Sequence, residues 1–342
     1  MSIAAKNPTP SVTAGPSIFV NGAGVAGLTV AWQLYRHGFR VTLAERAGTV
    51  GAGASGFAGG MLAPWCERES TEEPVLTLGR LAADWWEAAL PGHVHRRGTL
   101  VVAGGRDTGE LERFSRRTSG WEWLDEAAIA ALEPDLAGRF RRALFFRQEA
   151  HLDPRQALAA LAAGLEDARM RLTLGVVGEA EVDHDRVVDC TGAAQIGRLP
   201  GLRGVRGEML CVETSELSLS RPVRLLHPRH PIYIVPRDEN RFMIGATMIE
   251  SDDGGPITAR SLMELLNAAY AMHPAFGEAR VTETGAGVRP AYPDNLPRVT
   301  QEGRTLHVNG LYRHGFLLAP AMAGEVARRL LTDQGQPERR PS

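Results

Sequence analysis

Three glycines near the start of the chain have the spacing of a site for phosphate groups. They belong to the segment Gly-Ala-Gly-Val-Ala-Gly at residues 22–27. Gly22 allows a tight turn, Gly24 allows the backbone to approach a pyrophosphate, and Gly27 allows a helix to pack closely on a strand. Backbone amides at the start of that helix would face the phosphates at the favourable end of the helix dipole. The segment therefore predicts that the chain binds a dinucleotide.

An acidic residue follows these glycines at the distance that a ribose contact requires. Glu45 lies 18 positions after Gly27, close to the roughly 20 residues expected for an acid that binds a ribose diol. A carboxylate at this position would repel the additional phosphate of NADP. The motif alone does not distinguish FAD from NAD.

The elements that must position these residues form a strand–helix–strand unit. A short apolar segment at 17–20 precedes the glycines, a helical pattern follows them as far as Gly38, and residues 40–44 form a second strand. Such a unit begins a parallel sheet. Other short strands are expected at 99–102, 187–189, 208–212, 232–235, 242–244 and 306–308. Helices are expected at about 75–90, 109–117, 154–168, 258–272 and 316–331.

Nucleotide-type elements thus occur at the front, middle and end of the chain, so we expect two interleaved domains. The nucleotide-binding domain is predicted to comprise 17–95, 150–200 and 286–334, and the substrate domain 96–149 and 201–285. Residues 1–16, rich in Ser, Thr, Ala and Pro, are expected to form a disordered leader, and 335–342 a flexible tail.

Composition excludes several classes of function. The 342 residues carry 38 basic and 40 acidic side chains, a net charge of −2, which offers no field for nucleic acid or an acidic membrane. No apolar run approaches the roughly 20 residues of a membrane helix. Cys66, Cys190 and Cys211 lack paired or metal-type spacing, and the histidines lack metal-ligand spacing. We expect a cytoplasmic protein with reduced thiols and no metal.

Four further motifs, in the same order, resemble those of the D-amino-acid oxidase superfamily of FAD-dependent oxidoreductases. Ala54-Ser55-Gly56 with Gly59 to Pro64 resembles its flavin-contacting segment, and Val187 to Gly192 resembles its strand ending in Thr-Gly. Arg206-Gly207-Glu208 resembles the turn into its substrate-domain sheet, and Asn309 to Phe316 its C-terminal flavin motif. The resemblance implies an α/β (α+β two-domain) fold: a Rossmann-type FAD-binding domain with an interleaved antiparallel-sheet substrate domain.

Within the superfamily, segments 149–154, 233–248 and 287–298 resemble the glycine oxidases of thiamine biosynthesis. This resemblance implies substrate contacts by Tyr233, Met248, Arg289 and Arg313. It also implies FAD contacts by Gly22, Gly24, Val25, Ala26, Gly27, Glu45, Arg46, Gly53, Ala54, Ser55, Gly60, Met61, Val176, Thr191, Gly192, Leu311, Arg313, His314, Gly315, Phe316 and Leu317, with Val177 as the alternative to Val176. No cysteine lies in 289–320, where sarcosine oxidases attach their flavin, so FAD is expected to bind non-covalently.

The chemistry of these side chains suits a small amino acid. An arginine guanidinium meets a carboxylate with two parallel hydrogen bonds, and Arg289, between small residues and Pro290, has the setting of a strand end at a cavity. A tyrosine hydroxyl can add a bond without adding charge. His314 is not expected to act as a general base, since hydride transfer to FAD does not require one.

The predicted function is an FAD oxidase that converts glycine, sarcosine or a small D-amino acid to the imine with dioxygen and releases hydrogen peroxide. The imine then hydrolyses to the oxo acid and ammonia or passes to thiazole synthase. Three alternatives stay open: a dehydrogenase of the same fold that uses a quinone or carrier, the oxidase lobe of a tRNA-modifying enzyme, and a redox-silent flavin-binding subunit. The oligomeric state is also open, although homo-oligomers occur in the family.

Overall fold

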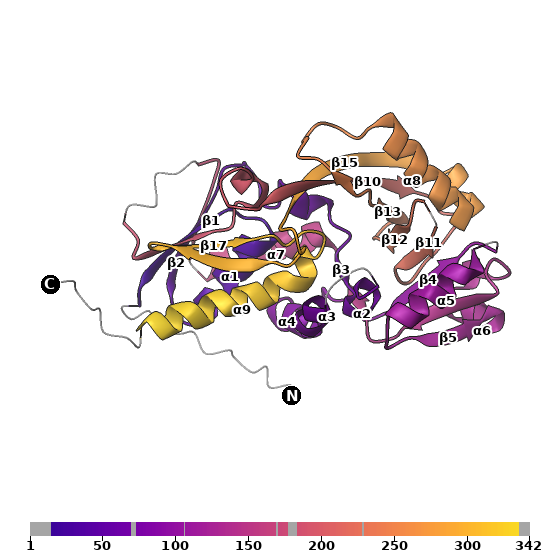
Figure 1. The fold of residues 1–342 in the computed structure, drawn as a ribbon, viewed down its shortest axis with the longest axis horizontal. Helices are drawn as coiled ribbons and strands as arrows, with labels where there is room; N and C mark the ends of the chain where they lie inside the picture. The colour runs from indigo at the N-terminus through magenta and orange to yellow at the C-terminus, as the bar shows by residue number, and fades with distance from the viewer. Residues whose placement is uncertain are drawn as a thin grey trace.

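A computed structural model describes residues 15–69, 73–105, 107–168, 170–176, 183–227 and 229–334. Two large sheets lie at opposite ends of the molecule, and the chain passes between them several times (Figure 1). The expected leader, except for residues 15 and 16, and the expected tail lie outside the described residues. So does Val177.

In the described part of the chain, six strands form the first sheet. Their order is β16 (Arg298–Glu302), β17 (Thr305–Asn309), β9 (Arg186–Asp189), β1 (Ser17–Asn21), β2 (Arg40–Glu45) and β8 (Arg171–Leu174). All neighbours are parallel except β16 and β17. The first strand–helix–strand unit is therefore confirmed, and β1 lies at the centre of a Rossmann-type sheet.

Three helices pack with this sheet: α1 (Val25–Arg36), α7 (Pro154–Asp167) and α9 (Gly315–Gln334). The Asp153 side chain caps α7 by accepting hydrogen bonds from the amides of Arg155 and Gln156, with Pro154 as its first residue. Pro320 lies inside α9 and cannot donate to the carbonyl of Phe316. The indole of Trp86 donates to that carbonyl instead, at 2.8 Å.

The second sheet contains nine strands among the described residues. Their order is β14 (Ile249–Glu250), β10 (Arg203–Glu213), β13 (Arg241–Gly245), β12 (Ile232–Pro236), β11 (Val223–Leu226), β4 (Thr99–Ala103), β6 (Arg142–Phe146) and β5 (Glu122–Asp125), with β15 (Arg280–Ala291) on β10. All pairs are antiparallel except β4 with β11. Helices α5 (Thr108–Arg117), α6 (Glu126–Leu132) and α8 (Ala259–Met272) pack with it.

Short elements join the longer strands and helices. They are η1 (Ala54–Phe57), β3 (Met61–Leu62), α2 (Pro64–Glu67), α3 (Glu73–Gly79), α4 (Ala82–Ala89), η2 (Pro134–Leu136), β7 (Ala150–His151), η3 (Gly192–Gln195) and η4 (Pro274–Gly277). The prediction of a single helix at 75–90 is wrong, because α3 ends at Gly79 and a second helix, α4, begins at Ala82. The domain boundary expected at 286 falls inside β15, which pairs with β10 as far as Ala291.

Candidate active site

A cavity of about 990 Å³ lies between the two sheets, with both polar and apolar walls. One end is formed by the glycine turn between β1 and α1, and the other by Tyr233, Arg289 and Arg313. The cavity therefore joins the predicted nucleotide site to the predicted substrate site.

The glycine turn has the geometry expected of a phosphate-binding loop. Gly22 has a φ of +101°, and a Cβ there would lie 2.8 Å from the carbonyl oxygen of Cys190. A Cβ on Gly27 would lie against the carbonyl oxygen of Gly22, so only glycine allows α1 to approach the turn. Gly24 precedes α1 without a side-chain cap, and Val25 donates its amide to the Ser55 hydroxyl at 3.1 Å. Gly27 thus packs the helix rather than lining the cavity.

Glu45 ends β2 beside this turn. One carboxylate oxygen accepts a hydrogen bond from the amide of Ala23 at 2.7 Å, and the other accepts from the amide of Ala47 at 2.9 Å. These bonds hold the carboxylate at the cavity wall, where Val176 and Thr191 also lie. This is the position that a ribose contact requires.

Replacement of Glu45 by Ala is expected to weaken FAD binding by about 1.5–3 kcal/mol, the value of a hydrogen bond to a charged group. Turnover at saturating FAD is expected to change little, because Glu45 lies at the end of the cavity away from Tyr233 and Arg289. Titration of the apoprotein with FAD measures the effect. A dissociation constant equal to that of the wild type would show that Glu45 does not hold the ribose.

The two segments whose resemblance implies flavin contacts also line the cavity. They are the 54–61 segment and the start of α9, where Gly315 and Phe316 line the space. Gly60 has a φ of +73°, and a Cβ on it would lie 2.1 Å from the carbonyl oxygen of Leu152, so the segment bends there only because the residue is glycine. The N-terminal end of α9 faces the cavity and favours negative charge.

Arg289 lines the end of the cavity where the substrate is predicted to bind. It lies near the end of β15, and its Nη1 donates to the carbonyl oxygen of Thr247 at 3.0 Å. Among the described residues, no carboxylate lies within ion-pair distance of it. Burial, together with the nearby Arg313 charge, lowers the pKa of Arg289 to about 10. Arg289 is half-buried, and a cation that is partly removed from water without an anion carries a desolvation cost, so this end of the cavity favours an anionic ligand.

Arg313 and Tyr233 are also brought to this end, but both already have a partner there. Arg313 forms an ion pair with Glu67, whose Oε2 lies 3.1 Å from its Nε. The Tyr233 hydroxyl donates to Glu67 Oε1 at 2.8 Å and accepts from Arg224 Nη1 at 2.9 Å. Of the three arginines described at this end, Arg289 is thus the one that lacks an acidic partner.

Glu67 is the centre of this cluster and is almost fully buried, with 5% of its surface exposed. Burial alone would raise its pKa, but the charge of Arg313, the charge of His314 when it is protonated in acid, the charge of Arg224 and the Tyr233 hydrogen bond outweigh burial and lower the pKa to about 2. Glu67 is therefore a carboxylate at neutral pH. Burial lowers the pKa of His314 to about 4, so this imidazole is neutral and suited to packing rather than proton transfer.

A second buried carboxyl group lies behind Glu67. Glu149 is fully buried and accepts a hydrogen bond from the amide of Cys66 at 2.7 Å. Burial is the main reason that its pKa rises to about 7. Its hydrogen bond fixes α2, the helix that carries Glu67.

The raised pKa of Glu149 predicts a pH-dependent stability. Below about pH 4.5 the group is protonated in both folded and unfolded chains. As pH rises to about 7, only the unfolded chain loses the proton, so stability falls by an amount on the order of 3 kcal/mol. Glu149→Gln, which stays neutral, should therefore raise the unfolding midpoint above the wild type at pH 8 but not at pH 4.5. Equal differences at both pH values would contradict this assignment.

The structure brings nearly all predicted site residues to one cavity. Those that line it are Gly22, Gly24, Val25, Ala26, Glu45, Arg46, Gly53, Ala54, Ser55, Gly60, Met61, Val176, Thr191, Gly192, Tyr233, Met248, Arg289, Leu311, Arg313, Gly315 and Phe316. Gly27, His314 and Leu317 do not line it, because Gly27 packs on the turn and the other two side chains are buried. The contact of every one of these residues with FAD or substrate stays a prediction.

Glu67 and Arg224 were not predicted from the sequence. Glu67 ends a helix of four residues that begins at Pro64, too short for a periodic pattern. Arg224 lies on β11, directly opposite Tyr233 on β12. The sequence did contain one indication of Arg224. Its neighbours Val223, Leu225 and Leu226 are typical of a buried strand, and a charged residue in such a strand needs a partner.

Known proteins with similar sequences or folds are FAD-dependent oxidoreductases and glycine oxidases. A family model described as DAO, FAD dependent oxidoreductase, matches residues 17–329. A Rhizobium etli protein with the provisional name thiamine biosynthesis oxidoreductase ThiO is 96% identical over 325 residues, 95% of this chain and 99% of that one. The glycine oxidase of Bacillus licheniformis is 28% identical, over 91% of this chain and 92% of its own. The crystal structure of glycine oxidase from Geobacillus kaustophilus has the same fold, with a TM-score of 0.77 and 24% identity over 93% and 95% of the two chains.

Proposed function

Since the chain belongs to the DAO family of FAD-dependent oxidoreductases and to its ThiO branch, we propose that it oxidises glycine, or sarcosine or a small D-amino acid, with dioxygen. The products are the imine, or the oxo acid and ammonia after hydrolysis, and hydrogen peroxide. The observation that carries this proposal is Arg289, a half-buried guanidinium that lines the end of the cavity and has no described acidic partner. A substrate carboxylate supplies the missing anion.

The residues of the chain account for binding and placement. FAD, held by the glycine turn, Glu45, the 54–61 segment and the start of α9, supplies the acceptor for hydride from the substrate α-carbon. Arg289 holds the substrate carboxylate in a two-pronged contact, and Met248 lies at the mouth with Sδ 3.2 Å from Arg313 Nη1. Placement of the α-carbon is the main task that remains for the protein.

The charges of the cluster fit a monocarboxylate. Arg289, Arg224 and Arg313 carry three positive charges at this end, and Glu67 and Glu69 carry two negative ones. A bound carboxylate therefore supplies the acidic partner that Arg289 lacks. Glu67 is held in place by its hydrogen bonds to Arg313 and Tyr233.

The reaction would supply an imine for thiamine biosynthesis, which is the setting given in the name of the Rhizobium etli relative. Thiazole synthase is then the partner that receives it. The cytoplasm is the proposed compartment, and the three cysteines are free thiols as expected there. No helix among the described residues is long and apolar enough to cross a membrane.

Peroxide formation across a panel of small amines tests the proposal. The purified, FAD-loaded protein is expected to form peroxide with glycine, sarcosine or D-alanine and to consume an equal amount of oxygen. Reduction of an artificial acceptor without oxygen uptake would indicate the dehydrogenase alternative. Bound FAD that no amine reduces would indicate a redox-silent subunit.

We also expect FAD to bind without a covalent bond. The described cavity wall contains Cys190, at the adenosine end, but no cysteine near the start of α9. Acid or heat should therefore release intact FAD into the supernatant. Yellow colour that stays with the denatured polypeptide would show the opposite.

A further inference from the structure

A buried ion pair lies behind the wall of the cavity. Side chains of β10 alternate between two faces: Gly207 and Met209 line the cavity, whereas Arg206 and Glu208 lie on the other face. Arg206 is 2% exposed and Glu208 is fully buried, and Arg206 Nη2 lies 2.8 Å from Glu208 Oε1. Neither side chain reaches the cavity, so neither can touch substrate or FAD.

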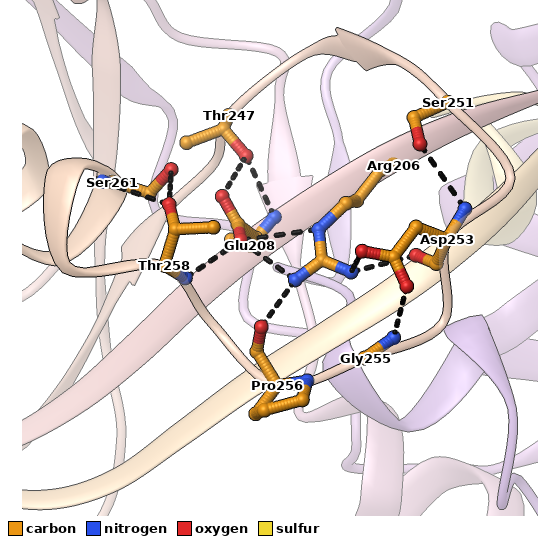
Figure 2. Close-up of polar contacts among 9 residues, drawn as sticks. All are labelled: Arg206, Glu208, Thr247, Ser251, Asp253, Gly255, Pro256, Thr258 and Ser261. Atoms are coloured by element: carbon orange, nitrogen blue, oxygen red, sulfur yellow. Dashed lines mark hydrogen bonds and ion pairs between the residues drawn. The ribbon is translucent and has the colours of Figure 1, made fainter.

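Arg206 ties this pair to the loop before α8 (Figure 2). Its Nη1 donates to the carbonyl oxygen of Asp253 at 2.6 Å, and its Nη2 donates to the carbonyl oxygen of Pro256. Glu208 Oε1 also accepts from the amide of Thr258 at 3.0 Å. The pair therefore joins β10 to the chain that leads into α8.

Glu208 also fixes the segment between β13 and β14, through Thr247. The Thr247 hydroxyl accepts from the amide of Glu208 at 2.9 Å and lies 3.2 Å from Glu208 Oε2, to which it donates. The amide of Thr247 donates to the carbonyl oxygen of Glu208 at 3.1 Å. Three contacts with one residue thus hold Thr247.

The pairing with β10 is irregular at this point. Met209 pairs with Gly245 on β13, and Arg206 pairs with Ile249 on β14. Residues 246–248 on one side therefore oppose only 207 and 208 on the other, which is a β-bulge of one residue. A bulge turns backbone groups away from the hydrogen bonds between neighbouring strands. Here the carbonyl group of Thr247 is turned away in this manner.

The Thr247 carbonyl contacts Arg289. It accepts from Arg289 Nη1 at 3.0 Å, and a Cβ on Gly207 would lie 2.1 Å from Arg289 Cζ. The guanidinium therefore lies flat on β10, on the side opposite the ion pair. With no described acidic partner, Arg289 takes its orientation from this carbonyl and from the backbone beneath it.

We propose that Glu208, held by Arg206, is a positioning residue for the carboxylate-binding arginine: it fixes Thr247, and the Thr247 carbonyl orients Arg289 toward the substrate carboxylate. This inference rests on the proposed function of Arg289. A purely structural pair would stabilise the sheet without any effect on carboxylate affinity. A positioning pair would contribute both to the stability of the sheet and to the affinity for a carboxylate.

Acetate binding separates the two roles, because acetate carries a carboxylate and no amine. Binding is followed as a change in the absorbance spectrum of the FAD-loaded protein, without turnover. Thr247→Val, which removes the hydroxyl, and Glu208→Gln are each expected to weaken acetate binding about tenfold, the effect of one lost hydrogen bond. Thr247→Ser, which keeps the hydroxyl, is expected to bind acetate like the wild type.

Glu133→Gln is the matched control, because Glu133 is a buried carboxylate paired with Arg221 and lies outside the cavity. It should lower the unfolding midpoint as Glu208→Gln does but leave acetate affinity unchanged. If Thr247→Val and Glu208→Gln bind acetate as tightly as Glu133→Gln, the positioning role is overturned and the proposed function stands. If the wild type binds no acetate, both are overturned.

Discussion

Replacement of Arg289 by Ala should raise the Michaelis constant for glycine steeply. A carboxylate drawn into the cavity needs a paired charge, and the loss of one partner of a buried, hydrogen-bonded charge pair costs about 2–5 kcal/mol. This corresponds to a factor of roughly thirty or more. Arg289→Lys should recover only part of the effect, because an ammonium lacks the two-pronged geometry. Steady-state peroxide formation over a range of glycine concentrations measures the change.

Two controls separate carboxylate binding from general damage. A primary amine without a carboxylate should be oxidised poorly and about equally by wild type and variant. Arg203→Ala, which removes an arginine on β10 that pairs with exposed Glu250, should leave the kinetics with glycine unchanged. Normal glycine kinetics in Arg289→Ala would contradict the assignment and move the carboxylate contact to Arg313.

Replacement of Glu67 by Leu should be strongly destabilising. Removal of one member of a buried ion pair leaves the other charge without compensation, at a cost of about 3–5 kcal/mol. Here the residue left is Arg313, since Arg224 retains Glu69 at 3.3 Å. Urea unfolding of the FAD-loaded protein at a fixed FAD concentration measures the loss. The double variant Glu67→Leu with Arg313→Leu should recover a large part of it, because neither member of this ion pair then remains without its partner.

The pH dependence of this effect follows from the pKa of Glu67, which folding lowers to about 2. Its contribution to stability is complete above the unfolded pKa of about 4.5 and is lost as pH falls toward 2. The difference between wild type and Glu67→Leu should therefore be largest at neutral pH and should shrink in acid. A single variant as stable as the wild type at pH 7 would show that Arg313 does not depend on Glu67.

The unit of β1, α1 and β2 could be predicted because its signals are local. The glycine turn, the helix after it and Glu45 lie within 24 consecutive residues, 22–45, and each has a distinct physical requirement. The same holds for the cap of α7, where Asp153 and Pro154 are adjacent. Such signals need no knowledge of distant parts of the chain.

The features that could not be predicted from the sequence depend on contacts between distant segments. The break between α3 and α4 follows Gly79, where a Cβ would lie 2.8 Å from Leu317 Cγ on α9. The role of Glu67 depends on its contact with Arg313, which lies 246 positions later in the chain. The family resemblance supplied Tyr233, Arg289 and Arg313, but not that Glu67 already binds two of them.

The position of Arg289 shows how far sequence reasoning could go. Small neighbours and Pro290 indicated a strand end at a cavity, and Arg289 does lie near the end of β15. Its orientation depends on Gly207 of β10 and Thr247 of a bulge, both brought to it only by the sheet. Pattern and spacing within 286–291 contain no information on either contact.

Anaerobic titration of the FAD-loaded protein with glycine tests the central claim most directly. We expect the absorbance of oxidised flavin to disappear with glycine, and to return on admission of air with one equivalent of hydrogen peroxide. Arg289→Ala should require far more glycine for the same loss of absorbance. A flavin that stays oxidised in the presence of glycine, sarcosine and D-alanine, in a protein that has its full content of FAD, would contradict the account.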